Sequence, residues 1–429
     1  MTPLGHSAWQ TFSALLAGRT IADRLAELPA DIAPVDLVRA VGAVSFAQHS
    51  SCDPSVELAE RAGREALTMA GVTQNEVADI PCIIATSKGA VHALTAAADR
   101  HQSLAVSPRK YPQPSTTTRP ADAHLAVTLG PHGYLTHHLR HRLGLGVTTH
   151  LVAACASSLI ALHRARLALL NAPPKPDGES FRGASRRGIS RTLILTADAA
   201  LLPSFIHAYH RLGVLAPLTA ATYRGYPLDS RAHGFMIAEA GAAVLLERID
   251  DPHYLPPRHA IELLDTAEAC EAFDLIRSDE KLPALTRLAR QLMQGRNIDL
   301  IHPHATGTEH HDTYELHALL PHLSHSKSEI SNLKSPLPNP QSAIRNPKSD
   351  PDLYAHKGAL GHTLGTSGLI STVLACLCSR TGRRPPMPWL EQPIAAHLRA
   401  KSAARPIRTQ AIFAAGFAGH TAGAILRAP

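Results

Sequence analysis

The stretch from 151 to 170, LVAACASSLIALHRARLALL, constrains the fold more than any other part of the chain. Its first residues, up to Ala154, are small and apolar, as at the end of a buried strand. From Leu159 onward leucines recur near helical spacing, and two serines before them suit a helix start. The pattern predicts a buried strand joined to a helix by a turn that contains Cys155.

Cys155 has two interpretations on this stretch alone. A thiol near a helix N-terminus faces the positive end of the helix dipole and free amide groups, which favour thiolate and can hold an oxyanion. Cysteine is also a common buried core residue. The local sequence therefore leaves a nucleophile and a packing residue equally open.

Two distant stretches favour the nucleophile. His304 lies in HPHATGTEHHDTYEL, and Lys357 and His362 lie in HKGALGHTLGTSGLIS. With the Cys155 stretch they resemble the β-ketoacyl synthases, the decarboxylating condensing enzymes of the thiolase superfamily. That family has a nucleophilic Cys, then His in His-Gly-Thr-Gly-Thr, then Lys four residues before Gly-His. The motifs occur here in the family's order, and the resemblance covers nearly the whole chain.

The resemblance implies an α/β, thiolase-like fold of two similar βαβαβαββ halves, packed in α-β-α-β-α layers. Residues 1–248 would form the half that carries the nucleophile, and residues 249–429 the half that carries both histidines. No sequence repeat relates the halves, so the duplication rests on the resemblance. The stretch at about 324–352 is rich in Ser, Pro and Asn without an apolar period, which predicts a flexible surface insertion.

The start of the chain departs from the family pattern. Residues from Thr2 to Gly5 resemble a family loop that follows an N-terminal strand of the central sheet, so the first strand is missing here. Either the start lies upstream, or the protein does without this strand. The second option would leave a gap in the middle of a sheet with unpaired backbone groups, so we favour an upstream start.

The resemblance assigns a chemical role to five residues. Cys155 would accept the acyl group, because a thiolate is both a good nucleophile and a good leaving group. His304 and His362 would donate Nε–H groups to the enolate oxygen of a decarboxylating malonyl thioester. Lys357 would tune the histidines electrostatically. Phe417 would act as a gate, with its N–H joining that of Cys155 in an oxyanion hole.

Residues around this site would contact the pantetheine arm of the substrate, and some of them differ from the family sequence. By resemblance, the hydroxyls of Thr306 and Thr308 would bind a phosphopantetheine arm that arrives on the substrate, so no resident cofactor is expected. Ala305 and Ala418 replace family glycines, and Ser371 stands where fatty-acid elongating synthases carry Glu. These differences leave fatty-acid, specialised-lipid and polyketide-like biosynthesis all open as the pathway.

The expected partner is an acyl carrier protein, which is small and acidic. The chain carries 42 Lys and Arg against 35 Asp and Glu, a net charge of +7, and no nucleic-acid-binding motif. One loop gathers four arginines that form either a docking patch or merely a solubilising surface: Arg182, Arg186, Arg187 and Arg191. A homodimer, or a heterodimer with a related subunit, is expected, with the sheets joined edge to edge.

The remaining predictions concern compartment and metals. No run of about 18 apolar residues predicts a membrane span, and no secretory signal is visible. The six cysteines lack disulfide or zinc spacing, which fits the reducing cytoplasm. His137, His138 and His141 share a helix, but no acidic third ligand adjoins them, so we expect a solvated histidine face and no metal.

Two other functions stay open. A non-catalytic or chain-length-determining partner subunit of a heterodimeric synthase would share the fold. Such subunits usually lack the nucleophile, whereas this chain keeps Cys155. A thiolase-type or initiating synthase acting on coenzyme A esters would pair Cys with His and Asn, and His362 argues against it.

Overall fold

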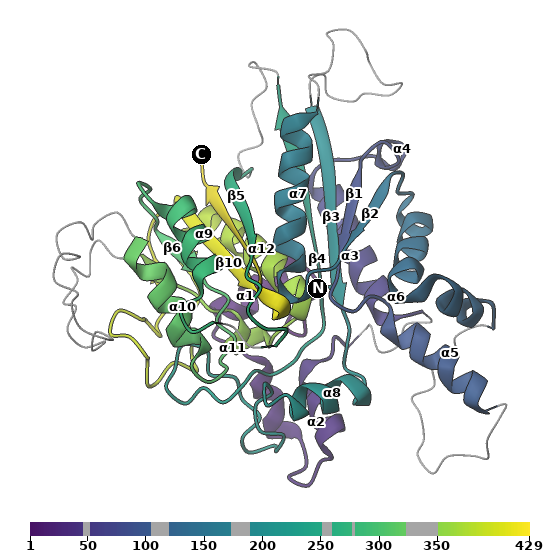
Figure 1. Cartoon of the computed structure of the whole chain (residues 1–429), viewed down its shortest axis with the longest axis horizontal. Helices are drawn as coiled ribbons and strands as arrows, with labels where there is room; N and C mark the ends of the chain where they lie inside the picture. The colour runs from purple at the N-terminus through teal and green to yellow at the C-terminus, as the bar shows by residue number, and fades with distance from the viewer. Residues whose placement is uncertain (46–51, 104–119, 173–188, 251–259, 277–278, 323–350) are drawn as a thin grey trace.

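The computed structural model describes residues 1–45, 52–103, 120–172, 189–250, 260–276, 279–322 and 351–429. Two β-sheets stand side by side, with helices between them and on their outer faces (Figure 1). Within these ranges no helix is both long and apolar enough to cross a bilayer. The predicted insertion, up to residue 350, lies outside the described residues, as do Arg182, Arg186 and Arg187.

The first sheet has four strands in the order β2-β1-β3-β4. Their bounds are β1 (Cys82–Ala85), β2 (Thr148–Leu151), β3 (Ile189–Asp198) and β4 (Ala240–Ile249). β1 pairs parallel with β2 and β3, and β4 pairs antiparallel with β3. Ile84 and Leu195 are fully buried, because helices cover both faces of this sheet, as in other parallel sheets.

The second sheet has five strands in the order β5-β11-β10-β6-β7. Their bounds are β5 (Glu262–Cys270), β6 (Leu300–His302), β7 (Asp352–Leu353), β10 (Thr409–Ala415) and β11 (His420–Arg427). β6 is parallel to β7 and β10, and β11 is antiparallel to β10 and β5. In order and direction, β1 to β4 match β6, β7, β10 and β11. The duplication, invisible in the sequence, is visible in the topology.

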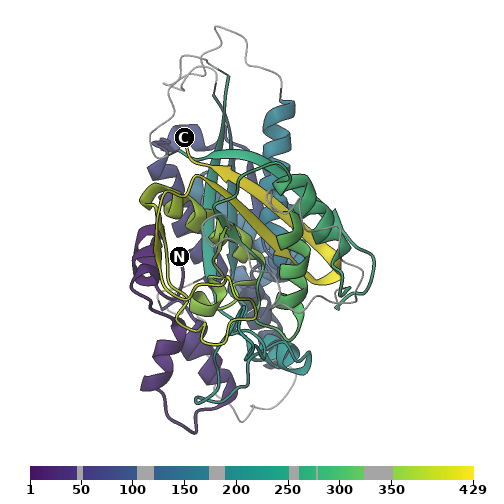
Figure 2. The same ribbon diagram turned by 90° about the vertical axis from the view of Figure 1, so that its left-hand side faces the viewer.

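The layers are those that the resemblance implied. α7 (Ser157–Asn171) and α12 (Ser367–Thr381) lie between the two sheets (Figure 1), and the sheets overlap when the molecule is viewed from the side of the second sheet (Figure 2). α3 (Pro54–Met69) and α6 (Pro120–Leu143) cover the outer side of the first sheet, while α9 (Pro283–Met293) and α10 (His311–Leu319) cover the second. The thiolase-like α-β-α-β-α arrangement is therefore confirmed. α12 is buried around most of its circumference, which explains why its sequence is apolar without a clear polar face.

Shorter elements close the ends of the sheets. Each central helix follows a 3₁₀ turn in its own half: η3 (Ala154–Ala156) precedes α7, and η6 (Leu364–Thr366) precedes α12. The others are α1 (Ala8–Leu16), η1 (Ile21–Glu27), α2 (Pro34–Gly42), α4 (Gln74–Val77), α5 (Val91–Ser103), α8 (Pro203–Arg211), η4 (Leu320–His322), α11 (Lys357–Leu360), β8 (Arg383–Arg384), β9 (Ala403–Ala404) and η7 (Phe417–Gly419).

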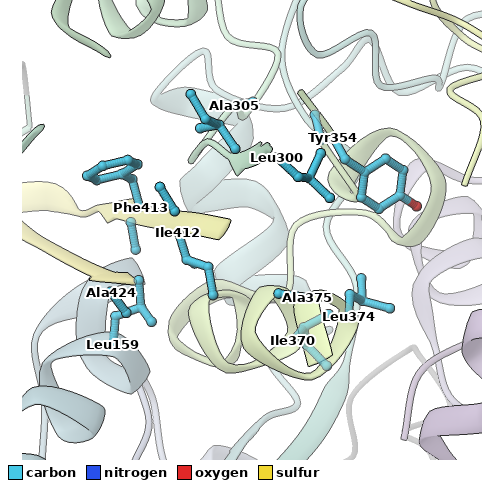
Figure 3. Packing of buried hydrophobic residues seen from close by; sticks show 14 of the residues in the cluster. Leu159, Leu300, Ala305, Tyr354, Ile370, Leu374, Ala375, Ile412, Phe413 and Ala424 are labelled. Carbon is cyan, nitrogen blue, oxygen red and sulfur yellow. The ribbon is translucent and has the colours of Figure 1, made fainter. Parts of the chain in front are cut away.

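The largest hydrophobic core fills the space between the sheets. Leu159 of α7, Leu374 of α12 and Phe413 of β10 all lie in it, each at most 2% exposed (Figure 3). Truncating a residue such as Leu159 to Ala would cost about 2–5 kcal/mol of unfolding free energy. This core fixes the two central helices, and with them the turns that precede each helix.

The open edge of the first sheet corrects one expectation. The four strands of the first sheet pair with one another without a gap. In the second sheet β5 pairs with β11, the strand that matches β4, so the matching position in the first sheet is the edge beside β4. The expectation of a gap in the middle of the sheet is therefore wrong. Met1 and Gly241 exchange backbone hydrogen bonds of 2.9 and 3.0 Å there, and a cavity of about 470 Å³ adjoins β4. An open edge leaves the rest of the ladder paired, so it costs less than an internal gap.

Candidate active site

Cys155 lies in the turn predicted for it, within η3 and directly before α7. The preceding strand is shorter than predicted, because β2 ends at Leu151 and Val152 is 51% exposed. Ala154 holds a φ of 47°, in the left-handed region that L-residues rarely adopt. The strained turn places Cys155 at the end of the central helix, where it is half-buried.

The predicted oxyanion hole joins two loops from different halves. A Cβ on Gly416 would lie 3.0 Å from the Cys155 nitrogen, so only glycine permits this approach. Phe417 follows and begins η7, which contacts η3. The N–H groups of Cys155 and Phe417 donate no hydrogen bond to another residue within the described ranges. Both donors therefore stay available to an oxyanion, although their role stays a prediction.

The two predicted histidines meet in space. His304 follows β6 and His362 follows α11, and their ring centroids lie 5.4 Å apart at an interplanar angle of 81°. His304 is 5% exposed and His362 is 1% exposed. The ring of Phe235 packs edge-on against His362 at 4.8 Å. Two segments that are distant in the sequence thus form one imidazole pair.

Both imidazoles are neutral at physiological pH. Burial lowers the pKa of His304 and that of His362 well below 6.5, and the Lys357 ammonium lowers both further. The Nδ1 atom of each ring is buried without a hydrogen-bond partner among the described residues. A buried Nδ1–H donor without an acceptor would be costly, which favours the tautomer with the proton on Nε2. The Nε–H donor role of each ring stays a prediction.

Lys357 is 4% exposed and donates through Nζ to the carbonyl of His304. Burial lowers its pKa, and the nearby carboxyl of Glu315 opposes that shift. In turn, burial raises the pKa of Glu315. The ammonium therefore binds the backbone of the histidine loop, and its electrostatic role stays a prediction.

Sequence reasoning missed two acids that hold the His304 loop. Glu315 accepts the N–H groups of His304 and Ala305 at 2.6 and 2.7 Å. Asp312 accepts those of Leu228 and Gly307 at 2.7 and 3.1 Å. Both lie on α10, and their spacing in HHDTYEL places them on one helix face, a signal that could have found them.

Glu315→Gln is expected to loosen this loop. An amide cannot accept with both of its heavy atoms, so one of the two N–H groups would lose its partner in a buried site. The free energy of unfolding should fall by about 1–3 kcal/mol, measured by urea denaturation. The control Glu309→Gln, at an exposed carboxylate before α10, should change it by less than about 0.5 kcal/mol. Equal losses in both variants would contradict the assignment.

Strained backbone gathers around the site. Of the seven non-glycine residues described with positive φ, four adjoin the predicted catalytic and gating residues: Ala154, Ala305, Leu364 and Ala418. Such conformations cost about 1–3 kcal/mol each and concentrate at functional sites. Ala305 and Ala418 stand at the two family glycine positions, so the left-handed backbone is retained here with alanine.

The other predicted residues lie near this centre. Thr306 and Thr308 follow His304, and their hydroxyls are 3.0 Å apart. Ser371, the substitute for the family Glu, lies within α12, and its hydroxyl is 3.3 Å from Nδ1 of His356. It therefore contacts a buried imidazole beside Lys357 and not the His304–His362 pair.

The environment of Cys155 differs from the expectation. Burial raises the pKa of the Cys155 thiol to about 12, and Lys357 opposes this only in part. Desolvation of a thiolate thus opposes the field that the turn was expected to supply. The stabilised thiolate stays a prediction.

Family profiles match both halves of the chain. The profile described as "Beta-ketoacyl synthase, N-terminal domain" matches residues 36–172, and "Beta-ketoacyl synthase, C-terminal domain" matches residues 281–391. Together they cover more than half of the chain, including Cys155, His304, Lys357 and His362. The chain belongs to the β-ketoacyl synthase family.

Curated relatives include polyketide synthases and a 3-oxoacyl-[acyl-carrier-protein] synthase. Over 301 residues, 64% of its length, this chain shares 27% identity with a highly reducing polyketide synthase of Aspergillus niger. It shares 26% identity over 165 residues, 37% of the chain, with 3-oxoacyl-[acyl-carrier-protein] synthase 2 of Mycobacterium leprae. The matched regions cover only 10% of the first relative and 34% of the second.

Solved ketosynthases have the same fold. A type II polyketide ketosynthase in complex with its acyl-carrier protein superposes with a TM-score of 0.71 at 16% identity, covering 100% of this chain and 97% of that one. The ishigamide ketosynthase/chain length factor superposes with a TM-score of 0.68 at 17% identity, covering 100% and 96%. At such low identity the likeness shows the fold, while the roles of single residues stay predictions.

Proposed function

We propose that this chain is a β-ketoacyl-[acyl carrier protein] synthase, which condenses a malonyl thioester with an acyl group held on Cys155. The observation that carries the proposal is the His304–His362 pair. Two buried imidazoles meet there, with Nδ1 of each ring unpartnered among the described residues, and the turn η6 that follows His362 contacts the turn η3 of Cys155. Such a pair suits stabilisation of an enolate and not general-base catalysis by a single histidine.

The acylation step transfers an acyl group between two sulfurs. The Cys155 sulfur attacks the thioester carbonyl of the acyl-pantetheine, and the pantetheine sulfur leaves. The proton lost by Cys155 goes to the departing pantetheine thiolate, so charge balances. The N–H groups of Cys155 and Phe417 would hold the tetrahedral oxyanion. Because burial raises the pKa of the Cys155 thiol, this proton transfer would accompany attack.

The condensation step releases carbon dioxide. The bond between the malonyl carboxylate and its α-carbon breaks, and the electron pair passes to the thioester oxygen as an enolate. The Nε–H groups of His304 and His362 would donate to this oxygen. The α-carbon then attacks the acyl carbonyl on Cys155, and Cys155 leaves as thiolate, which takes up a proton. The product is a β-ketoacyl thioester on the carrier.

The proposed partner is an acyl carrier protein, and its phosphopantetheine supplies the only prosthetic group. Thr306 and Thr308 would contact that arm. Arg191 does not extend the proposed docking patch, because it pairs with Glu247 at 2.9 Å and with Glu76 at 3.2 Å. The cysteine usage supports the cytoplasm as the compartment.

Intact-protein mass spectrometry tests the proposal. The protein is incubated with carrier protein that bears a hexanoyl group, and the acylated peptide is then mapped. A hexanoyl adduct on Cys155 is the expected result. A folded protein that gains no adduct from any acyl carrier would contradict the proposal. That outcome would favour the alternative, a non-catalytic or chain-length-determining partner subunit, to which the similar ketosynthase/chain length factor structure is relevant.

The proposed dimer would use the edge strand β2. β2 has β1 as its one neighbour among the described strands, and Val147 and Val152 at its two ends are 72% and 51% exposed. An unpaired sheet edge with exposed valines at both ends is an interface or an aggregation hazard. Light scattering should give about twice the 45.8 kDa of one chain.

Val147→Asp should shift this dimer toward the monomer, since a charge would be buried at the joint. The control Leu170→Asp places the same charge at another exposed apolar residue, at the end of α7, and should leave the mass unchanged. A wild-type protein that is monomeric at micromolar concentration would contradict the dimer. Loss of the dimer in both variants would contradict its placement at β2.

A further inference from the structure

A lysine lies in the turn beside the nucleophile. Lys88 follows β1, and its turn is fixed by Asp198 at the end of β3. Asp198 accepts the Ser87 N–H at 3.0 Å, the Ser87 hydroxyl at 2.9 Å and the Lys88 N–H at 3.1 Å. A Cβ on Gly365 would lie 2.9 Å from the Ser87 nitrogen and 3.0 Å from the Ala154 oxygen. The Lys88 turn therefore adjoins the residue before Cys155.

The ammonium of Lys88 is held over aromatic rings of α8. Its Nζ lies 5.6 Å from the ring centroid of Phe205 and 5.7 Å from that of Tyr209. Tyr209 in turn lies 6.1 Å from Phe235, the residue that packs against His362. Successive ring contacts thus connect the Lys88 ammonium to His362.

This cation forms no ion pair and no side-chain hydrogen bond within the described part of the chain. There it lies over the two aromatic rings and interacts electrostatically with Asp198 and Cys155. The nearest acid, Asp198, already accepts the three hydrogen bonds of the turn and does not approach Nζ within ion-pair distance. Lys88 is half-buried, so its three donors are only partly satisfied.

The position of the Lys88 ammonium would determine which acyl groups bind favourably in the site. An alkyl chain packed against Nζ would remove water from the ammonium without forming a hydrogen bond in its place, which is unfavourable. A carboxylate would receive a charge-assisted hydrogen bond, stronger than one between neutral groups. The aromatic rings beneath would pack against the methylene chain that leads to that carboxylate.

Building on the proposed function, we propose that Lys88 is a specificity-determining residue that selects acyl groups with a carboxylate on the chain beyond the thioester. The acyl group on Cys155 would then derive from a dicarboxylic acid and not from a simple fatty acid. The reaction that supplies it must form a monothioester of a dicarboxylic acid.

The test compares two thioesters of equal chain length. Hexanoyl-pantetheine ends in a methyl group, and adipoyl-pantetheine ends in a carboxylate. The rate of adduct formation on Cys155 is measured for each by mass spectrometry in wild type, Lys88→Met and Lys88→Arg. The wild type should prefer adipoyl, and Lys88→Met should lower the adipoyl-to-hexanoyl ratio by roughly tenfold or more. Lys88→Arg should keep most of the preference, and the surface control Lys401→Met should keep all of it.

The outcomes separate this inference from the proposed function. Adduct formation with an unchanged ratio in Lys88→Met would overturn the inference and leave the condensing activity standing. Wild type that forms no adduct with either thioester would overturn the proposed function and the inference with it. If Lys88→Met slows both thioesters equally and also slows alkylation of Cys155 by neutral iodoacetamide, then Lys88 activates the thiol and does not select the acyl group.

Discussion

Cys155→Ala is expected to lower the rate of acyl transfer from carrier to protein by roughly a thousandfold or more, because the variant has no nucleophile to form the thioester. The fold should survive, since one small half-buried side chain replaces another. The free energy of unfolding should change by about 1 kcal/mol or less. Intact-protein mass spectrometry measures the transfer, and urea denaturation measures the stability.

The matched control is Cys378→Ala, at a fully buried cysteine of α12. That variant should lose some stability while keeping acyl transfer. If Cys155→Ala keeps acyl transfer near the wild-type rate, Cys155 is not the nucleophile and is instead a packing residue. Because burial raises the pKa of Cys155 to about 12, its alkylation by iodoacetamide should also quicken about tenfold per pH unit from pH 7 to 9. A plateau near pH 7 would contradict this environment.

His304→Ala and His362→Ala should each lose malonyl decarboxylation by about a hundredfold to a thousandfold, the usual effect of removing one preorganised donor to an oxyanion. Acylation of Cys155 should survive at least in part, because its oxyanion is held by backbone N–H groups. Release of carbon dioxide from malonyl carrier measures the first step, and adduct formation measures the second.

A suitable control is His163→Ala, at a half-buried histidine of α7 whose ring contacts Thr266. It should leave both steps unchanged within a few-fold. Normal decarboxylation in either active-site variant would show that the division of roles is wrong. Loss of both steps together in the active-site variants, with the fold intact, would show that the histidines serve acylation as well.

Local patterns in the sequence predicted local structure well. The small apolar run followed by spaced leucines placed Cys155 in a turn before α7, because helix start signals and apolar periodicity act over a few residues. The motif order further identified His304, Lys357 and His362, which the structure brings together.

Other features depended on contacts that no short stretch encodes. The spacing of Asp312 and Glu315 places them on one face of a helix, but only the folded chain brings the His304 loop against that face. Arg191 belongs to an arginine-rich stretch, but the folded chain pairs it with Glu76 and Glu247. The role of each charged side chain depends on the group it binds in the folded chain and not on its neighbours in sequence.

The sequence by itself determined the family, the candidate nucleophile and the turn that carries it, because these depend on residue types at short spacing. Only the tertiary structure decided how burial and charge act on the groups of the site, and that the open edge of the first sheet lies beside β4. The environment of Cys155 includes Lys357 from the other half, and Phe235 of the first half packs against His362 of the second. Burial and field act through space, so they follow from the packing of the halves and not from the order of residues.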